Sequence, residues 1–243
     1  DFASISILLL PLLLKPALND ANTSLGWRNN ITLWQFNIHA QSVLGNSCLP
    51  ICLKKIKLVS YLASLKRTSF FTVCRFVDCE LNNLTDELSS EFTAFLLGCS
   101  FSFENALTDS GIYLPHFEKK GNVAMYSTSL NTRPSKYFSG PLVVSMRWIP
   151  EDKVDLAVKI TEKYKKNHGG PIHIGDPSKI GINSIESPDF GEYWSPLNKN
   201  DIPVFWACGV TPQLSLQKSK LPLVYTHSPG YMFVTDLKEN EYS

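Results

Sequence analysis

The spacing of apolar and polar residues changes near residue 70. Before that point apolar residues are frequent but follow no clear period, apart from a continuous apolar run at residues 5–14 (ISILLLPLLL). After it, short apolar segments alternate with glycine and proline turn signals. Helices and strands in alternation predict a mixed α/β architecture for the second part of the chain.

The apolar run at residues 5–14 is too short to span a bilayer and is interrupted by Pro11. Its length suits a targeting signal, but no basic residue precedes it. We therefore expect a buried strand or helix, with a targeting segment as the alternative. Because no other segment approaches the length of a membrane span, we expect no membrane partner.

A helix is predicted over residues 85–97. Thr85 can cap its start, Gly98 can end it, and phenylalanine and leucine recur within it at helical spacing. A second, short helix is predicted over residues 102–107, with Ser102 as its cap.

The clearest helix is predicted over residues 150–167. Glu151 and Asp152 suit its positive N-terminal end, and Gly169 and Gly170 stop it. The side chains expected on its inner face recur at helical spacing: Val154, Ala157, Val158, Thr161 and Tyr164.

Five short strands are predicted from apolar or β-branched runs bounded by turn residues. They cover residues 142–146, 172–174, 204–207, 223–226 and 231–235. Several of these runs lead into chemically capable side chains beside a glycine or a proline, which is a common way to place such groups in a cleft.

Composition narrows the class of protein. Of the 243 residues, 44% are hydrophobic and 19% are charged, as in a folded globular chain and unlike a disordered one. The formal net charge of +1 gives no electrostatic case for binding nucleic acid. The six cysteines are expected to be free thiols. Cys48 and Cys52 have metal-ligand spacing but lack a second pair, so no metal site is predicted.

Glu104 is the first candidate for chemistry. It closes the segment GCSFSFE, next to Phe103, where burial would raise the pKa of its carboxyl group and suit acid–base work. Ser100 and Ser102 precede it, and the backbone N–H groups around them could hold an anion. The alternative is that Ser102 only caps a helix while the phenylalanines pack.

The segment HGGPIHIGDP (residues 168–177) is the densest polar cluster. His173 lies in a strand-like stretch, and Asp176 is close enough in sequence to orient its ring, so His173 is a candidate base. His168 is expected at a helix C-terminus, where a cation is favoured. A metal site that joins His173 to Asp189 and His227 is a weaker alternative, because the spacing is irregular.

Four further residues complete the candidate site. Arg147 follows a buried strand and could clamp a substrate carboxylate, although an internal ion pair with Glu or Asp explains it equally well. Cys208 ends the run PVFWAC before a glycine and could be an acid, a nucleophile or a small buried residue. Thr211, which begins the next segment, and His227, at a strand end, are candidates for substrate binding.

Seven segments, taken together, resemble the hydro-lyase family that includes D-glutamate cyclase. They read FLLGCSFSFENAL, NVAMYSTS, GPLVVSMRWI, HGGPIHIGDPSKIGI, PDFGEYW, PVFWACGVTPQ and THSPGYMFVTDL. Residues 1–69 match the family poorly, and Trp148 follows Arg147 where the family usually has proline. We therefore divide the chain into a divergent part, residues 1–69, and a hydro-lyase-like domain, residues 70–243.

The resemblance implies a layered α/β sandwich with a smaller α+β subdomain. It also implies an enzyme that closes D-glutamate to 5-oxo-D-proline with loss of water, and that catalyses the reverse reaction. The substrate would be a small carboxylate, no cofactor would be required, and the location would be mitochondrial. The chain could also form a homo-oligomer.

Ring closure suggests a role for each candidate. The amine must lose a proton, the oxyanion must be stabilised and the departing oxygen must gain a proton. We expect Arg147 to clamp a carboxylate, His173 with Asp176 to act as the base, and Glu104 or Cys208 to act as the acid. Four alternatives stay open: a hydro-lyase that acts on a different small acid, a non-catalytic binder of small carboxylates, a fragment that cannot fold because its N-terminal part is divergent, and a metal-dependent hydrolase.

Overall fold

The computed structural model describes eight segments of the chain: residues 2–11, 71–74, 78–81, 92–119, 121–135, 138–219, 224–227 and 233–238. The pair Cys48 and Cys52 and residues 85–91 of the first predicted helix lie outside these segments. Within the segments, no helix has both the length and the apolar character needed to cross a membrane.

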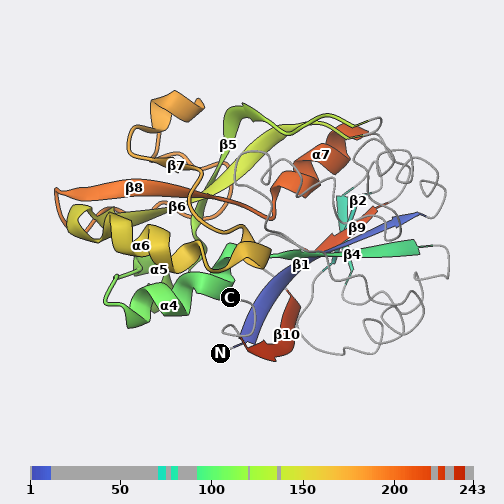
Figure 1. The fold of residues 1–243 in the computed structure, drawn as a ribbon. Helices are drawn as coiled ribbons and strands as arrows, with labels where there is room; N and C mark the ends of the chain where they lie inside the picture. The colour runs from blue at the N-terminus through green and yellow to red at the C-terminus, as the bar shows by residue number, and fades with distance from the viewer. Residues whose placement is uncertain are drawn as a thin grey trace.

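A four-stranded antiparallel sheet, in the order β5-β6-β8-β7, lies on the left in Figure 1. Its strands are β5 Ala124–Asn131, β6 Pro141–Pro150, β7 His173–Ile174 and β8 Asp201–Ala207. The strands predicted at residues 142–146, 172–174 and 204–207 are confirmed by β6, β7 and β8. The apolar centre of β6 is buried throughout, as expected of a strand with neighbours on both edges.

The four-stranded sheet has two buried faces, because successive residues of a strand point to opposite sides. Arg147 pairs with Val204, and Met146 pairs with Phe205. Val204 belongs to one core cluster, whereas Met146 and Phe205 belong to another. We call the side of Arg147 and Val204 the helix face and the side of Met146 and Phe205 the loop face.

Three helices lie on the helix face (Figure 1). They are α4 Glu104–Asp109, α5 Pro115–Lys119 and α6 Val154–Thr161. The buried cluster between helices and sheet consists of Phe103, Leu107, Ile112, Leu114, Ile149, Ala157, Tyr164, Val204 and Trp206. On the loop face, Ile180 of the 3-10 helix η5 Pro177–Ile180 packs with Tyr126 and Phe205.

The helix predicted over residues 150–167 is broken into three pieces. The pieces are η3 Glu151–Lys153, α6 and η4 Lys165–Asn167. After Thr161 two backbone N–H groups bond three residues back instead of four, which tightens the last turn. Tyr164 is buried there, and its ring packs edge-on against Phe103 with 6.3 Å between ring centroids. Of the predicted inner face, Ala157, Thr161 and Tyr164 are buried, and Val154 and Val158 are half-buried.

The helix predicted over residues 85–97 is wrong over its described part, which is strand β4 (Phe92–Gly98). The strand pairs antiparallel with β1 (Phe2–Pro11) along its whole length. A short apolar run cannot be assigned to helix or strand by its period alone, so the distant partner decides. The apolar run at residues 5–14, for which strand and helix were both open, forms β1 in its described part.

Strands β1 and β4 belong to a six-stranded sheet with the order β10-β1-β9-β2-β3 and with β4 paired to β1. All of its pairings are antiparallel. Its other strands are β2 Phe71–Cys74, β3 Asp78–Leu81, β9 Val224–His227 and β10 Phe233–Lys238. Helices combined with antiparallel strands confirm the mixed α/β class. The layered sandwich with a smaller subdomain and the division at residue 70 stay predictions.

A 3-10 helix, η2 Ser100–Phe103, leads into α4 where a short helix was predicted from Ser102. The expectation that Ser102 caps this helix is wrong. Helical backbone begins earlier, with Cys99 in the cap position of η2 and Phe103 in that of α4, and neither side chain makes a capping hydrogen bond. Ser102 is therefore inside the helical turn and buried.

Candidate active site

Glu104 lies at the centre of a buried polar cluster on the helix face. It starts α4, and its side chain is almost fully enclosed, with the residue 3% exposed. Its Oε1 accepts hydrogen bonds from Arg147 Nε, at 2.8 Å, and from Arg147 Nη2. His116 Nε2 lies 2.8 Å from the same oxygen. One carboxylate oxygen thus joins α4, α5 and β6.

Two serine hydroxyls extend this arrangement. Ser145 Oγ accepts from Arg147 Nη1 at 3.0 Å, and Ser100 Oγ accepts from Arg147 Nη2 at 3.3 Å. The two hydroxyl oxygens are 3.3 Å apart. Ser145 and Arg147 are two residues apart in β6, so they point to the same face of the sheet. We call these five residues the Glu104 cluster: Ser100, Glu104, His116, Ser145 and Arg147.

Two aromatic rings pack against the guanidinium of Arg147. The Phe103 and Trp206 ring centroids lie 5.2 Å and 5.4 Å from its central carbon. Trp206 Nε1 in turn donates to Thr161 Oγ1 at 3.1 Å, which fixes the ring. Cation–π attraction of this kind is strongest where water is excluded, so these rings help to hold Arg147 in a single orientation.

The pKa of Glu104 is lowered, which contradicts the sequence-based expectation of a raised value. Burial by itself raises the pKa of the carboxyl group. The positive charge of Arg147 and the hydrogen bonds from His116 and Arg147 lower the pKa by more than burial raises it. Glu104 is therefore ionised at neutral pH, so in the resting protein it suits a proton acceptor better than an acid.

Arg147 forms the internal ion pair that the sequence left open as the alternative to a substrate clamp. The residue is 2% exposed, and its described hydrogen bonds go to Glu104 and to two serines. A charge enclosed in this way needs its partner, because neither group is solvated by water. The first role of Arg147 is thus to position Glu104.

Cys99 and Cys208 are free, buried thiols. Burial raises the pKa of Cys99 to about 12 and also raises the pKa of Cys208. The Cys208 sulfur lies 3.4 Å from the Met125 sulfur within an apolar cluster. Both groups are protonated at neutral pH, so neither is a thiolate nucleophile in this state. The acid role of Cys208 stays a prediction.

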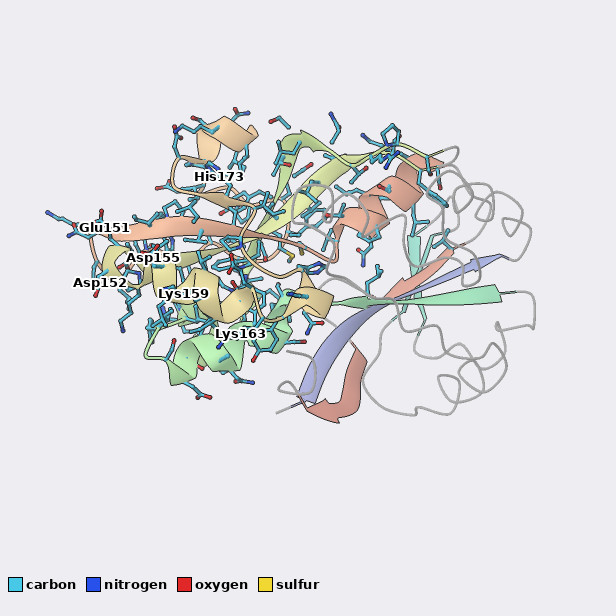
Figure 2. All side chains as sticks on the ribbon, viewed as in Figure 1. Glu151, Asp152, Asp155, Lys159, Lys163 and His173 are labelled. Carbon is cyan, nitrogen blue, oxygen red and sulfur yellow. The ribbon has the colours of Figure 1, made fainter. Side chains whose placement is uncertain are left out.

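His173 lies apart from the Glu104 cluster. It pairs with Phe205 across β7 and β8, which places it on the loop face, and its ring centroid is 5.8 Å from that of Phe205. Figure 2 shows His173 beside β7, with α6 on the other side of β8. A small substrate that contacts Glu104 from the helix face would be separated from His173 by the sheet itself.

Asp176 contacts His173 through its backbone and not through its carboxylate. His173 Nε2 donates to the backbone oxygen of Asp176 at 2.8 Å. The Asp176 carboxylate accepts from the backbone N–H and the hydroxyl of Ser178, at 3.0 Å and 2.7 Å. Asp176 caps η5 in this way, because an aspartate before a helical turn can satisfy its free N–H groups.

Thr211 is engaged with the backbone of β6. Its Oγ1 accepts from the N–H of Val143 at 2.9 Å and donates to the carbonyl oxygen of the same residue at 3.2 Å. These bonds attach the start of α7 (Thr211–Ser219) to the sheet. Thr211 therefore has a structural task, and its predicted substrate contact stays a prediction.

The weaker metal alternative gains no support from the described residues. His227 lies in β9, in the six-stranded sheet. Asp189 accepts a hydrogen bond at 2.7 Å from the backbone N–H of Ser127 beside the four-stranded sheet. Among the residues whose positions are described, no three His, Cys, Asp or Glu side chains gather in a way that could hold a metal ion.

Sequence reasoning missed His116 and Ser145 and was wrong about the charge of His168. Ser145 could have been found as a polar residue within an apolar strand, two positions before Arg147. His116 carries no local signal, because the fold alone brings α5 to Glu104. His168 was expected as a cation, but burial and then the charge of Arg147 lower its pKa to about 4, so the ring is neutral.

An open hollow of about 720 Å³ lies elsewhere, at the ends of β6 and β8. It is lined by Pro150, Glu151, Asp152, Asn198, Lys199, Asn200 and Asp201. Figure 2 labels Glu151 and Asp152 at this outer end of the sheet. The Asp201 carboxylate accepts hydrogen bonds from the backbone N–H groups of Leu197 and Asn198. Since no member of the Glu104 cluster lines the hollow, we do not place the chemistry there.

The sequence model of a family described as D-glutamate cyclase matches residues 93–236, which include the whole Glu104 cluster. Relatives that carry the name "Putative hydro-lyase" come from Thermoanaerobacter sp. strain X514 (50% identity over 163 residues), Psychrobacter arcticus (50% over 162) and Saccharopolyspora erythraea (47% over 163). Each alignment covers 67% of this chain and 61%, 61% and 64% of the respective relative. The chain therefore spans less than two thirds of the length of these relatives.

Proposed function

The chain belongs to the D-glutamate cyclase family, and on that premise we propose that it is a hydro-lyase that interconverts D-glutamate with 5-oxo-D-proline and water. The observation that carries this proposal is the Glu104 cluster. A buried, ionised carboxylate, an arginine and a histidine meet there at one oxygen atom. Titratable groups that the fold encloses together are typical of acid–base sites.

The reaction requires proton transfer from the amino nitrogen of the substrate to the departing oxygen of its γ-carboxyl group. The α-nitrogen of D-glutamate attacks its γ-carboxyl carbon, so a C–N bond forms and a C–O bond breaks. Two protons leave the ammonium nitrogen, two reach the departing oxygen, and that oxygen leaves as water. No electrons are transferred to or from the substrate. The protein must therefore supply an acceptor, a donor and a stabilising charge for the oxyanion.

The Glu104 cluster can supply these three functions. His116 Nε2 and Glu104 Oε1 are 2.8 Å apart, so a proton can pass between imidazole and carboxylate. The hydroxyls of Ser100 and Ser145 lie beside the Arg147 guanidinium and can donate to an oxyanion. Enclosure strengthens each of these electrostatic effects, because little water is present to screen them.

Chiral chromatography tests the reaction. The purified chain is incubated with D-glutamate and, separately, with 5-oxo-D-proline, and the L-enantiomers serve as controls. We expect interconversion of the D pair alone. A sample that unfolds cooperatively but forms no product would contradict the proposal, and ligand-induced stabilisation without product would support a binding role instead. The mitochondrial location, which rests on resemblance alone, and the homo-oligomer are also proposals.

A further inference from the structure

Asn167 and His168 are buried polar residues whose side chains find no hydrogen-bond partner among the residues that the structure describes. Asn167 is 0% exposed and His168 is 5% exposed. Within the part of the chain that the structure describes, neither amide atom of Asn167 and neither ring nitrogen of His168 has a hydrogen-bond partner. Buried polar atoms are nearly always paired, and an unpaired one destabilises the fold. Four such atoms on consecutive residues therefore indicate that a bound molecule supplies their hydrogen bonds.

These residues adjoin the Glu104 cluster. The 3-10 helix η4, which ends at Asn167, lies against η2. Tyr164, directly before η4, packs on Phe103, and the Phe103 ring contacts the guanidinium of Arg147. The charge of Arg147 also contributes to the lowered pKa of His168. The unpartnered atoms thus belong to the same buried region as the proposed acid–base pair.

The backbone holds both side chains in this region. His168 has a φ of 78°, in the left-handed region that residues other than glycine seldom adopt. The N–H groups of Asn167 and Gly169 both donate to the carbonyl oxygen of Tyr164, at 2.8 Å and 3.0 Å. The turn is therefore well defined although its backbone is strained, so the two side chains have fixed positions.

The chemistry of the two side chains limits what can pair with them. A carboxamide presents an N–H donor beside a C=O acceptor, and a neutral imidazole presents one donor and one acceptor. A lactam carries N–H and C=O on one edge, so it can form two parallel hydrogen bonds with a carboxamide. A carboxylate next to that edge can accept the N–H of the imidazole.

We propose that Asn167 and His168 bind the lactam edge and the carboxylate of 5-oxo-D-proline and so hold the reacting molecule beside the Glu104 cluster. This assignment rests on the proposed function, whose product is that lactam. Asn167 and His168 are then positioning residues, and ordered water is the competing occupant.

Replacement of Asn167 by leucine tests the assignment. Calorimetric titration with 5-oxo-D-proline should show at least about tenfold weaker binding for Asn167→Leu than for the wild type, because a carboxamide pair is lost. The ligand-free variant should unfold at a higher temperature than the wild type, because an unpaired buried amide has been removed. The wild type should also bind N-methyl-5-oxo-D-proline at least about tenfold more weakly, since the lactam donor is missing. His173→Ala, on the loop face, is the matched control and should leave binding unchanged.

The outcomes separate this assignment from the proposed function. Unchanged binding in Asn167→Leu, with turnover of D-glutamate by the wild type, would overturn the assignment and leave the function standing. A lower unfolding temperature in ligand-free Asn167→Leu would also overturn it, because it would show an amide already satisfied by water. If the wild type forms no product, binding that depends on Asn167 still supports the assignment, and absent binding overturns both.

Discussion

Glu104 and Arg147 depend on each other because both are enclosed. With the two residues 3% and 2% exposed, neither charge is solvated by water, so each relies on the other and on neighbouring hydrogen bonds. The attraction within such a pair is largely offset by the cost of desolvating it. Its effect is therefore mainly geometric: it fixes the carboxylate next to His116.

Replacement of Arg147 by methionine should lower the free energy of unfolding by about 3–5 kcal/mol, because the Glu104 carboxylate is left buried without its partner. Adding Glu104→Gln to that variant should restore part of the loss, since the unpaired charge is removed. Urea unfolding of the wild type and of both variants measures these differences. A loss of less than about 1 kcal/mol in Arg147→Met, as for an exposed ion pair, would contradict the enclosed geometry.

Acid should destabilise the protein through His168. Burial and the charge of Arg147 lower its pKa from 6.5 to about 4, so between these values the unfolded chain binds a proton that the folded chain does not. Above about pH 6.5 the ring is neutral in both states, and the free energy of unfolding has its full value as far as His168 is concerned. As the pH falls from there toward 4, the free energy of unfolding decreases by up to about 1.4 kcal/mol per pH unit. The lowered pKa of Glu104 acts in the same direction, but only below its ordinary value of 4.5.

The variant His168→Asn isolates this effect, because asparagine tolerates a left-handed backbone and does not titrate. Urea unfolding between pH 7 and pH 5 (about the upper half of the His168 window) should show a shallower fall in stability than in the wild type. Equal slopes for the two proteins would contradict the account of His168.

Individual site residues were predictable only where local pattern carries the information. Glu104 next to phenylalanine and Arg147 at the end of an apolar run were identified from the sequence as candidates. The contact between Glu104 and His116 was not predicted from the sequence, because it depends on how α5 packs on the four-stranded sheet. The face of the sheet on which His173 lies was equally hidden, since a shift of one residue in strand register reverses every side chain.

At the level of elements, the backbone at residues 190–191 packs directly against the start of β5. Gly191 has a φ of +75°, and a Cβ there would overlap the carbonyl oxygen of Val123. Next to it, Phe190 and Met125 bond through their backbones, at 2.9 Å and 3.2 Å. Only glycine permits both the conformation and the close approach.

Gly191→Ala should therefore destabilise the protein more than Gly175→Ala. Gly175 also has a positive φ, +89°, but a Cβ there meets nothing within 4 Å. We expect a loss of about 1–2 kcal/mol for Gly175→Ala from the backbone alone, and about 2 kcal/mol more for Gly191→Ala from the overlap. Equal losses in denaturant unfolding would argue against the close approach to β5.

Elements were predictable where the sequence pattern and the final environment agree. The strands β6 and β8 combine β-branched and aromatic residues with buried surroundings, so their strand character is visible locally. The strand β4 is not visible in this way, because a short apolar run suits a helix equally well and only its pairing with β1 decides. The broken helix around α6 likewise reflects the burial of Tyr164.

At the scale of the whole molecule, the proposed site belongs to the helix face of the four-stranded sheet. The cluster draws on η2, α4, α5 and β6, and the family match at residues 93–236 covers them all. Asn167 and His168 add η4 to the same region. The loop face carries His173 and is separated from the cluster by the sheet. The proposed chemistry thus takes place on one face of the four-stranded sheet only.

The placement of the chemistry on the helix face is tested by initial rates of 5-oxo-D-proline formation from D-glutamate, measured by chiral chromatography for two variants. Glu104→Gln keeps the size of the side chain and removes its charge, whereas His173→Ala changes only the loop face. We predict a loss of about 100-fold or more for Glu104→Gln, as expected when a proton-transfer group is removed, and a rate within about twofold of the wild type for His173→Ala. An active Glu104→Gln variant together with an inactive His173→Ala variant would contradict the account and place the chemistry on the loop face.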